Sequence, residues 1–205
     1  MSAEPGFSEL MLDAVFPVDG QFLAREHALA LHAALVTRWP WLDEDVMSGI
    51  HAIKLVTGSS ALAMLSRRSR LLLRVRAERM PELLSLPSDL ELDVAGQVLR
   101  LGKPHARRLQ PHSTLYAYKL AANSADEVSF MQTVQQELAD LGIGGERVCG
   151  KHACTLLDGV ESHTFSMMLH ALTPAHSLRL QEFGLGPKRL LGCGLFVPHK
   201  SAAAV

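Results

Sequence analysis

The sequence lacks the features of a membrane-spanning or secreted protein. No apolar run approaches the roughly 18 residues that a transmembrane helix needs. Three cysteines cannot form a full disulfide framework, and so low a number suits a reducing compartment. Residues 1–12 contain two glutamates and no basic residue, so they do not resemble a signal peptide. We therefore expect a cytoplasmic protein with no membrane partner.

Tryptophan and tyrosine are also scarce, and neither sign of charge predominates. Tryptophan and tyrosine number two each, so base stacking on an aromatic sheet face is not expected as the main binding mode. The formal net charge is −1 at pH 7, which argues against a protein that coats nucleic acid non-specifically. Yet 10 of the 20 basic residues lie within residues 67–108, beside five acids. This uneven distribution is compatible with one face that binds anions.

The chain has enough apolar residues to fold around a core: 48% of its 205 residues are hydrophobic and 20% are charged. In the second half, hydrophobic periodicity and turn signals predict the order β-α-β-β-α-β, which is that of a ferredoxin-like domain. The predicted elements are strand 114–121, helix 125–141, strands 147–156 and 162–171, helix 174–183 and strand 195–197.

The first half fits the same order less closely. Its predicted elements are strand 10–18, helix 24–39, an acidic loop, strands 50–56 and 68–76, helix 77–86 and a hairpin of 90–94 with 97–101. Residues 104–111 are basic and bounded by prolines, which predicts a domain boundary. We therefore expect an α+β protein of two tandem ferredoxin-like (RRM-like) domains, 1–110 and 111–205.

A glycine-rich loop near the C-terminus is the most distinctive motif. Two Gly-x-Gly pairs are separated by five residues that include two cations. The residues are Gly184, Gly186, Lys188, Arg189, Gly192 and Gly194. Glycine lets backbone amides approach a phosphate, and the cations add charge. The loop has no Gly-Lys-Ser/Thr ending and runs from helix to strand, so it is neither a Walker A loop nor a dinucleotide fingerprint. The alternative is a tight turn that needs glycine for geometry alone.

A loop of this form, between the last helix and last strand of a second ferredoxin-like domain, resembles that of the CRISPR-associated repeat-RNA endoribonucleases. These belong to the repeat-associated RNA-binding (RAMP) superfamily. The first strand (13–18), the first helix (25–35) and segments 49–53 and 114–117 agree with the same family. The resemblance covers nearly the whole chain and points to the short branch found in myxobacterial-type CRISPR systems.

The resemblance implies metal-independent cleavage of precursor CRISPR RNA within its repeat, without a cofactor. The 2′-hydroxyl would attack the adjacent phosphate and leave a 2′,3′-cyclic phosphate and a 5′-hydroxyl. This reaction needs a base, an acid for the leaving oxygen, and cations for the phosphorane charge. The implied partner is a repeat RNA hairpin, and some family members also join other subunits of a CRISPR effector complex. A non-catalytic RNA-binding subunit of the same superfamily is the alternative.

The resemblance also implies where the catalytic residues lie, because the family's general base is on or just after the first helix. His32 matches that place best, with a packing histidine as the alternative. His27, in the first turn of the same helix, is the second candidate, since a helix N-terminus favours a neutral imidazole, with surface capping as the alternative. His51 is a candidate acid, and Lys54 is a candidate for stabilising phosphate charge. An alternating, half-exposed strand is the alternative for this last pair.

Candidate RNA-binding residues are the arginines of the basic stretch and the residues of the glycine-rich loop. They are Arg67, Arg68, Arg70, Arg107, Arg108, Gly184, Gly186, Lys188, Arg189, Gly192 and Gly194. A solvated charged face is the alternative for the arginines.

The cysteine and histidine spacing does not predict a metal site. Cys149 and Cys154 stand in a C-x4-C arrangement with one histidine between them and no second paired motif. On their predicted strand, residues 149–154 are expected to pack or to lie at an edge. His163, His170 and His176 show no metal-binding spacing.

Overall fold

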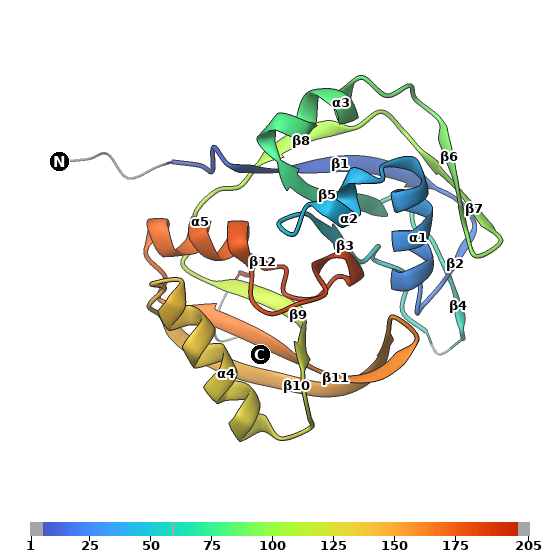
Figure 1. Cartoon of the computed structure of the whole chain (residues 1–205). Coiled ribbons are helices and arrows are strands. Elements are labelled where there is room, and N and C mark those ends of the chain that lie inside the picture. The colour runs from blue at the N-terminus through green and yellow to red at the C-terminus, as the bar shows by residue number, and fades with distance from the viewer. Residues whose placement is uncertain (1–5, 59, 201–205) are drawn as a thin grey trace. The chain divides into compact units, whose positions relative to one another are not determined.

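The structure is a computed structural model that describes residues 6–58 and 60–200. The described chain divides into two compact units. The N-terminal unit contains residues 11–107 and 190–192, and the C-terminal unit contains the rest. Both units combine helices with an antiparallel sheet (Figure 1). The α+β class predicted from the sequence is therefore confirmed.

The N-terminal unit is built on one main sheet and a small second sheet. Its elements are β1 (Met11–Asp19), β2 (Phe22–Ala24), α1 (Ala28–Arg38), α2 (Trp41–Glu44), β3 (Gly49–His51), β4 (Leu62–Met64), β5 (Arg70–Arg76), η1 (Ala77–Arg79), α3 (Met80–Leu84), β6 (Leu90–Val94), β7 (Gln97–Leu101) and β8 (His105–Arg108). The main sheet has the order β3-β5-β1-β7-β6, β8 also pairs with β1, and β2 pairs with β4. The order β3-β5-β1-β7 is that of a ferredoxin-like sheet.

The two faces of β1 have different surroundings. Ala14, Phe16 and Val18 alternate along the strand and are buried in one core with Leu31 and Leu35 of α1. Apolar residues at spacing four on α1 meet this face of the sheet, which explains why the segment folds as a helix here. The other face of β1 carries a buried charged residue that belongs to the site described below.

The C-terminal unit repeats the arrangement in a simpler form. Its elements are β9 (Leu115–Ala122), α4 (Glu127–Asp140), β10 (Glu146–Leu157), β11 (Val160–His170), α5 (Pro174–Phe183) and β12 (Val197–Pro198), and η2 (Arg189–Leu191) lies between α5 and β12. The sheet order is β10-β11-β9-β12. Phe130 of α4 and Leu180 of α5 share a core with Phe165 and Met167 of β11, so both helices pack on one sheet face (Figure 1).

Predicted and observed elements differ most in the N-terminal half. The helix predicted for residues 24–39 begins at Ala28, because residues 22–24 form β2 instead. Its partner β4 lies far along the chain, and local periodicity cannot reveal such a pairing. The strand predicted for 50–56 ends at His51, and β8 forms inside the predicted boundary segment 104–111. No helix in the described part of the chain has the length and apolar character to cross a membrane.

Candidate functional site

Residues 50–54 of the N-terminal unit, which we call the 50–54 segment, bring together several candidate residues. The segment contains the end of β3, with His51, and the chain that leaves it, with Lys54. Parts of the chain that are distant in sequence bond to it or lie against it. They come from the start of α1, from the turn before β5 and from the glycine-rich loop.

His27 is bonded within the protein through both ring nitrogens. Nδ1 lies 2.8 Å from the carbonyl oxygen of Ala24, and Nε2 accepts the backbone N–H of Ile53 at 3.1 Å. Since a carbonyl oxygen only accepts, Nδ1 carries the proton and the ring is neutral. The residue is buried. His27 therefore fastens the start of α1 to the 50–54 segment, and both of its ring nitrogens are engaged in doing so.

His32 forms a pair with a carboxylate that the sequence did not single out. Its Nε2 lies 2.7 Å from Oδ1 of Asp43 in α2, and 19% of its side chain is exposed. A carboxylate accepts only, so Nε2 carries a proton, and in the neutral ring Nδ1 holds the lone pair. Asp43 thereby fixes both the orientation and the tautomer of a partly accessible imidazole. This is the arrangement in which a histidine can accept a proton from a bound hydroxyl.

His51 lies close to a buried ion network on the other face of β1. Asp13 is buried and accepts hydrogen bonds from Arg74, at 2.9 Å between Nε and Oδ1, and from Arg107, at 2.7 Å between Nη2 and Oδ2. Burial by itself would raise the pKa of Asp13, but Arg74, His51 and Arg107 together hold it well below its usual value. The carboxylate is therefore ionised at neutral pH. Half of the Arg107 side chain remains exposed.

Lys54 lies beside the arginine-bearing turn. Its side chain is exposed, and its carbonyl oxygen accepts the Ser69 hydroxyl at 3.0 Å. Arg67 and Arg68 are exposed on this turn. Arg70 closes the same turn, because its Nη1 donates to the carbonyls of Arg67 and Ser69. The predicted cations thus fall into two kinds: Arg67 and Arg68 face solvent beside the 50–54 segment, and Arg70 is bonded to the backbone.

The glycine-rich loop is shaped by a close approach of its two ends. Gly184 and Gly194 have φ values of 64° and 69°, and a Cβ on Gly194 would lie 2.1 Å from the Leu185 carbonyl oxygen. Only glycine fits such a contact. Gly192 lies against the 50–54 segment, since a Cβ there would lie 3.4 Å from the Ile50 carbonyl oxygen. Gly184 and Gly194 are thus needed for the geometry of the turn. At Gly192 the loop lies beside His51, and phosphate binding by the loop stays a prediction.

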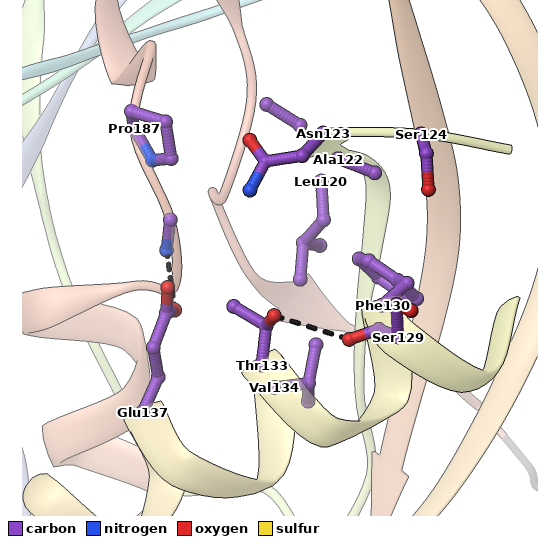
Figure 2. A pocket seen from close by; sticks show the side chains of 12 residues that line it. Leu120, Ala122, Asn123, Ser124, Ser129, Phe130, Thr133, Val134, Glu137 and Pro187 are labelled. Carbon is purple, nitrogen blue, oxygen red and sulfur yellow. Dashed lines mark hydrogen bonds between the residues drawn. The ribbon is translucent and has the colours of Figure 1, made fainter. Parts of the chain in front are cut away.

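The loop amides and cations also have partners in the protein. Gly186 N–H donates to Oε2 of Glu137 at 2.7 Å, at the edge of a cavity of about 190 Å³ in the C-terminal unit (Figure 2). A phosphate at this amide would have to displace a carboxylate. Arg189 is buried and donates to the carbonyls of Glu182 and Phe183, which closes the C-terminal end of α5. Lys188 is partly exposed and is paired with Asp158.

Arg108, the last residue of β8, belongs to the C-terminal unit and has a different environment from Arg107. Its guanidinium lies over the ring of Phe7, 4.1 Å from the ring centroid, in a cation–π contact within the C-terminal unit. The residue is exposed. It can therefore contact a phosphate while its guanidinium plane remains on the ring.

Sequence reasoning did not identify the acidic partners of the site. Asp43 lies 11 residues after His32 and beyond the end of α1 at Arg38, so helical spacing gives no signal for the pair. Asp13 is one charged residue inside an apolar strand, and this pattern was visible in the sequence. A lone charge at a strand position flanked by core residues indicates a buried pair, although it does not identify the partner.

Comparison with known proteins gives a consistent set of relatives. A family model described as Cas6 Crispr matches residues 12–201. The CRISPR-associated endonuclease Cas6 of Myxococcus xanthus (strain DK1622) is 34% identical over 197 residues, which cover 96% of this chain and 85% of the relative. A solved CRISPR associated protein Cas6 superposes with a TM-score of 0.65 at 11% identity, over 93% of this chain and 99% of that one. A RAMP protein binding different RNA substrates gives a TM-score of 0.60 at 10% identity, over 91% and 98% of the two chains.

Proposed function

The chain belongs to the Cas6 family, and from this membership we propose that it binds CRISPR repeat RNA and cleaves it within the repeat. The observation that carries the proposal is the 34% identity to a CRISPR-associated endonuclease over nearly the whole chain. The proposed reaction needs no metal. The RNA 2′-hydroxyl attacks the adjacent phosphorus, the bond to the 5′-oxygen breaks, and the products carry a 2′,3′-cyclic phosphate and a 5′-hydroxyl.

We assign the general base to His32. The pairing of its Nε2 with Asp43 supports this choice, because the ring is held in the tautomer whose Nδ1 can accept the 2′-hydroxyl proton. Asp43 is then a positioning residue, which also stabilises the imidazolium formed after proton transfer. His27 is the weaker candidate, since both of its ring nitrogens are bonded in the protein and the residue is buried.

His51 and Lys54 serve as the acid and the phosphate-stabilising cation in this proposal. This choice is supported by their positions on the 50–54 segment, against which Gly192 of the glycine-rich loop lies. The exposed Arg67 and Arg68 lie on the turn bonded to the same segment and would contact the RNA backbone. Backbone contacts of this kind suit recognition of an RNA hairpin by shape.

Further phosphate contacts are proposed at exposed positions outside the 50–54 segment. Arg107 has half of its side chain exposed, Arg108 is exposed, and Lys188 is partly exposed. We propose that 1–110 and 111–205 act as two domains in binding one hairpin. Subunits of a CRISPR effector complex are proposed as further partners of the bound product.

The test is single-turnover cleavage of a repeat RNA in EDTA, with the protein in excess over the RNA. Wild-type protein should cleave, and His32→Ala should slow the chemical step by about 10²- to 10⁴-fold while leaving RNA affinity unchanged. Asp43→Asn should slow the step less and shift its pH profile, because an amide no longer fixes the tautomer. His112→Ala removes an exposed histidine outside the candidate set and is the matched control.

Each outcome separates the candidates. Full activity of His32→Ala together with a loss in His51→Ala would move the base to His51. Tight binding of repeat RNA without cleavage by the wild-type protein would support the alternative, a non-catalytic RNA-binding subunit. Cleavage that EDTA abolishes and Mg²⁺ restores would contradict the metal-independent mechanism.

A further inference from the structure

A compact group of nitrogen and sulfur donors lies on the hairpin of β10 and β11, in the C-terminal unit. Cys154 and His163 are directly opposite each other in the register of the two strands. His152 is two residues before Cys154, so its side chain leaves the strand on the same face. The ligand atoms of the three residues all lie within 4.8 Å of one another. None of these residues takes part in the function proposed above.

Two of the three distances between the donor atoms are close to those of a tetrahedral zinc site. With Zn–N of about 2.05 Å and Zn–S of about 2.3 Å, tetrahedral angles place two nitrogens about 3.3 Å apart and a nitrogen and a sulfur about 3.6 Å apart. Here Nε2 of His152 lies 3.1 Å from Nδ1 of His163, and Sγ of Cys154 lies 3.5 Å from the same nitrogen. A small adjustment of side chains would complete the geometry.

Packing holds one of the rings in position. The ring of His152 lies 4.9 Å from that of Phe165, which stacks on Phe130 of α4 at 4.5 Å. The imidazole therefore rests on the core of the unit and has few rotamers to lose when a ligand binds. The β10–β11 ladder fixes the separation of the other two residues, because Cys154 and His163 are register partners. Donors on helices and strands hold the geometry of a site more precisely than donors on a loop.

Among the cysteines, Cys154 is the one suited to act as a ligand. Burial and Glu127 raise the pKa of the Cys149 thiol to about 11, and burial raises that of Cys193 to about 11 although Lys119 and Lys188 oppose it. Both thiols are therefore protonated at neutral pH. Cys154 is exposed and lies beside two histidines, so solvent can supply a metal ion and remove the proton that the thiol must lose.

We propose that His152, Cys154 and His163 bind one Zn²⁺ ion, with water as the fourth ligand. Two imidazoles and one thiolate form a donor set that suits zinc and disfavours Mg²⁺ and Ca²⁺, which prefer oxygen. Binding forms the Zn–S bond and releases the Cys154 thiol proton to the buffer, so affinity rises with pH. The ion ties β10 to β11 near the turn that carries Asp158, the partner of Lys188 in the glycine-rich loop. The proposed RNA cleavage does not pass through this ion.

The test uses Co²⁺ as a spectroscopic probe of the metal-free full-length chain and Zn²⁺ as competitor. Titration should give a near-ultraviolet band from thiolate-to-cobalt charge transfer that saturates at one equivalent, and Zn²⁺ should abolish it. Cys154→Ser should remove the band. His163→Asn, which keeps a polar side chain of similar shape, should weaken or remove saturable binding.

Cys149→Ser is the matched control, because it removes a cysteine of the same strand that lies outside the donor group. It should retain the wild-type spectrum. The far-ultraviolet circular dichroism of each metal-free variant shows whether it is folded, and Zn²⁺ should raise the Tm of the wild type and of Cys149→Ser but not that of Cys154→Ser. No thiolate band in the wild type, or an unchanged band in Cys154→Ser, would overturn the proposal.

Discussion

The sheets of the two units share the order of their four ferredoxin-like strands, but the polar groups buried in these sheets differ in kind. In the N-terminal unit, Asp13 and Arg74 lie on adjacent strands and are each 1% exposed as a charged pair. In the C-terminal unit the buried polar groups of β11 are neutral, and Thr164 donates to the carbonyl of Ala153 at 3.3 Å. The same strand order thus accommodates a buried ion pair in one sheet and buried neutral hydroxyls in the other.

The difference indicates where each unit is vulnerable. A buried charge that loses its partner retains its desolvation penalty, whereas a neutral hydroxyl that is lost leaves only an unmet carbonyl. In the N-terminal unit, stability should therefore respond to charge and pH. In the C-terminal unit, where Gly184 and Gly194 hold the glycine-rich loop in close contact, stability should respond to backbone geometry.

The largest expected effect is that of removing the buried carboxylate. Asp13→Ala leaves Arg74 charged and buried without its partner, so the free energy of unfolding should fall by about 3–5 kcal/mol. Urea denaturation followed by circular dichroism measures this change. Thr164→Val is the counterpart in the C-terminal sheet and should lose only about 1 kcal/mol. Equal losses in the two variants would remove the distinction between the units.

Glycine substitutions test the backbone side of the comparison. Gly194→Ala combines a φ of 69° with a Cβ 2.1 Å from a carbonyl oxygen, so it should lose about 3 kcal/mol. Gly186→Ala has a similar φ of 68°, but the nearest atom to its Cβ is 4.0 Å away, so it should lose about 1–2 kcal/mol. The difference between the two variants isolates steric contact from backbone strain. If both variants lose the same amount, the contact with the Leu185 carbonyl oxygen adds nothing to the cost of replacing Gly194.

Acid should weaken the N-terminal unit through the same ion network. The pKa of Asp13 is lower in the folded protein than in the unfolded chain, where it is about 3.9. Its contribution is therefore fully present above about pH 4 and is lost as the pH falls toward the folded value. Between pH 5 and pH 2 the urea midpoint should fall more steeply for the wild type than for Asp13→Asn, which cannot titrate at this position. Parallel curves for the two proteins would show that Asp13 does not couple folding to protonation.

The sequence predicted the C-terminal unit better because its signals are local. Pro174 in the first turn of α5 and the apolar spacing of α4 mark the helices without any knowledge of the fold. In the N-terminal unit, by contrast, Ala24 pairs with Leu62, and only the folded chain brings these residues together. The start of α1 was misplaced for that reason.

The candidate sites show the same division between local and distant signals. Asp158 and Gly159 both have positive φ, as a two-residue hairpin turn requires, so the register that places Cys154 opposite His163 could have been read from this dipeptide. The contact of Gly192 with the 50–54 segment had no such signal. The family resemblance pointed to residues 49–53 and to the glycine-rich loop, but it could not identify which cations are bonded to the backbone, as Arg189 is.

Helix capping gives the smallest test, and it concerns a single residue of the C-terminal unit. Thr173 caps α5 by accepting the N–H of His176 at 3.2 Å, whereas the N-cap of α1 makes no side-chain capping bond. Thr173→Ala should lose about 1 kcal/mol of stability in urea denaturation. Thr133→Ala is the matched control: its hydroxyl donates to a carbonyl one turn earlier inside α4, where alanine favours the helix, so it should be neutral or slightly stabilising. A loss in Thr133→Ala as large as that in Thr173→Ala would mean that the loss in Thr173→Ala is not specific to capping, and the contrast in helix starts would then have no energetic consequence.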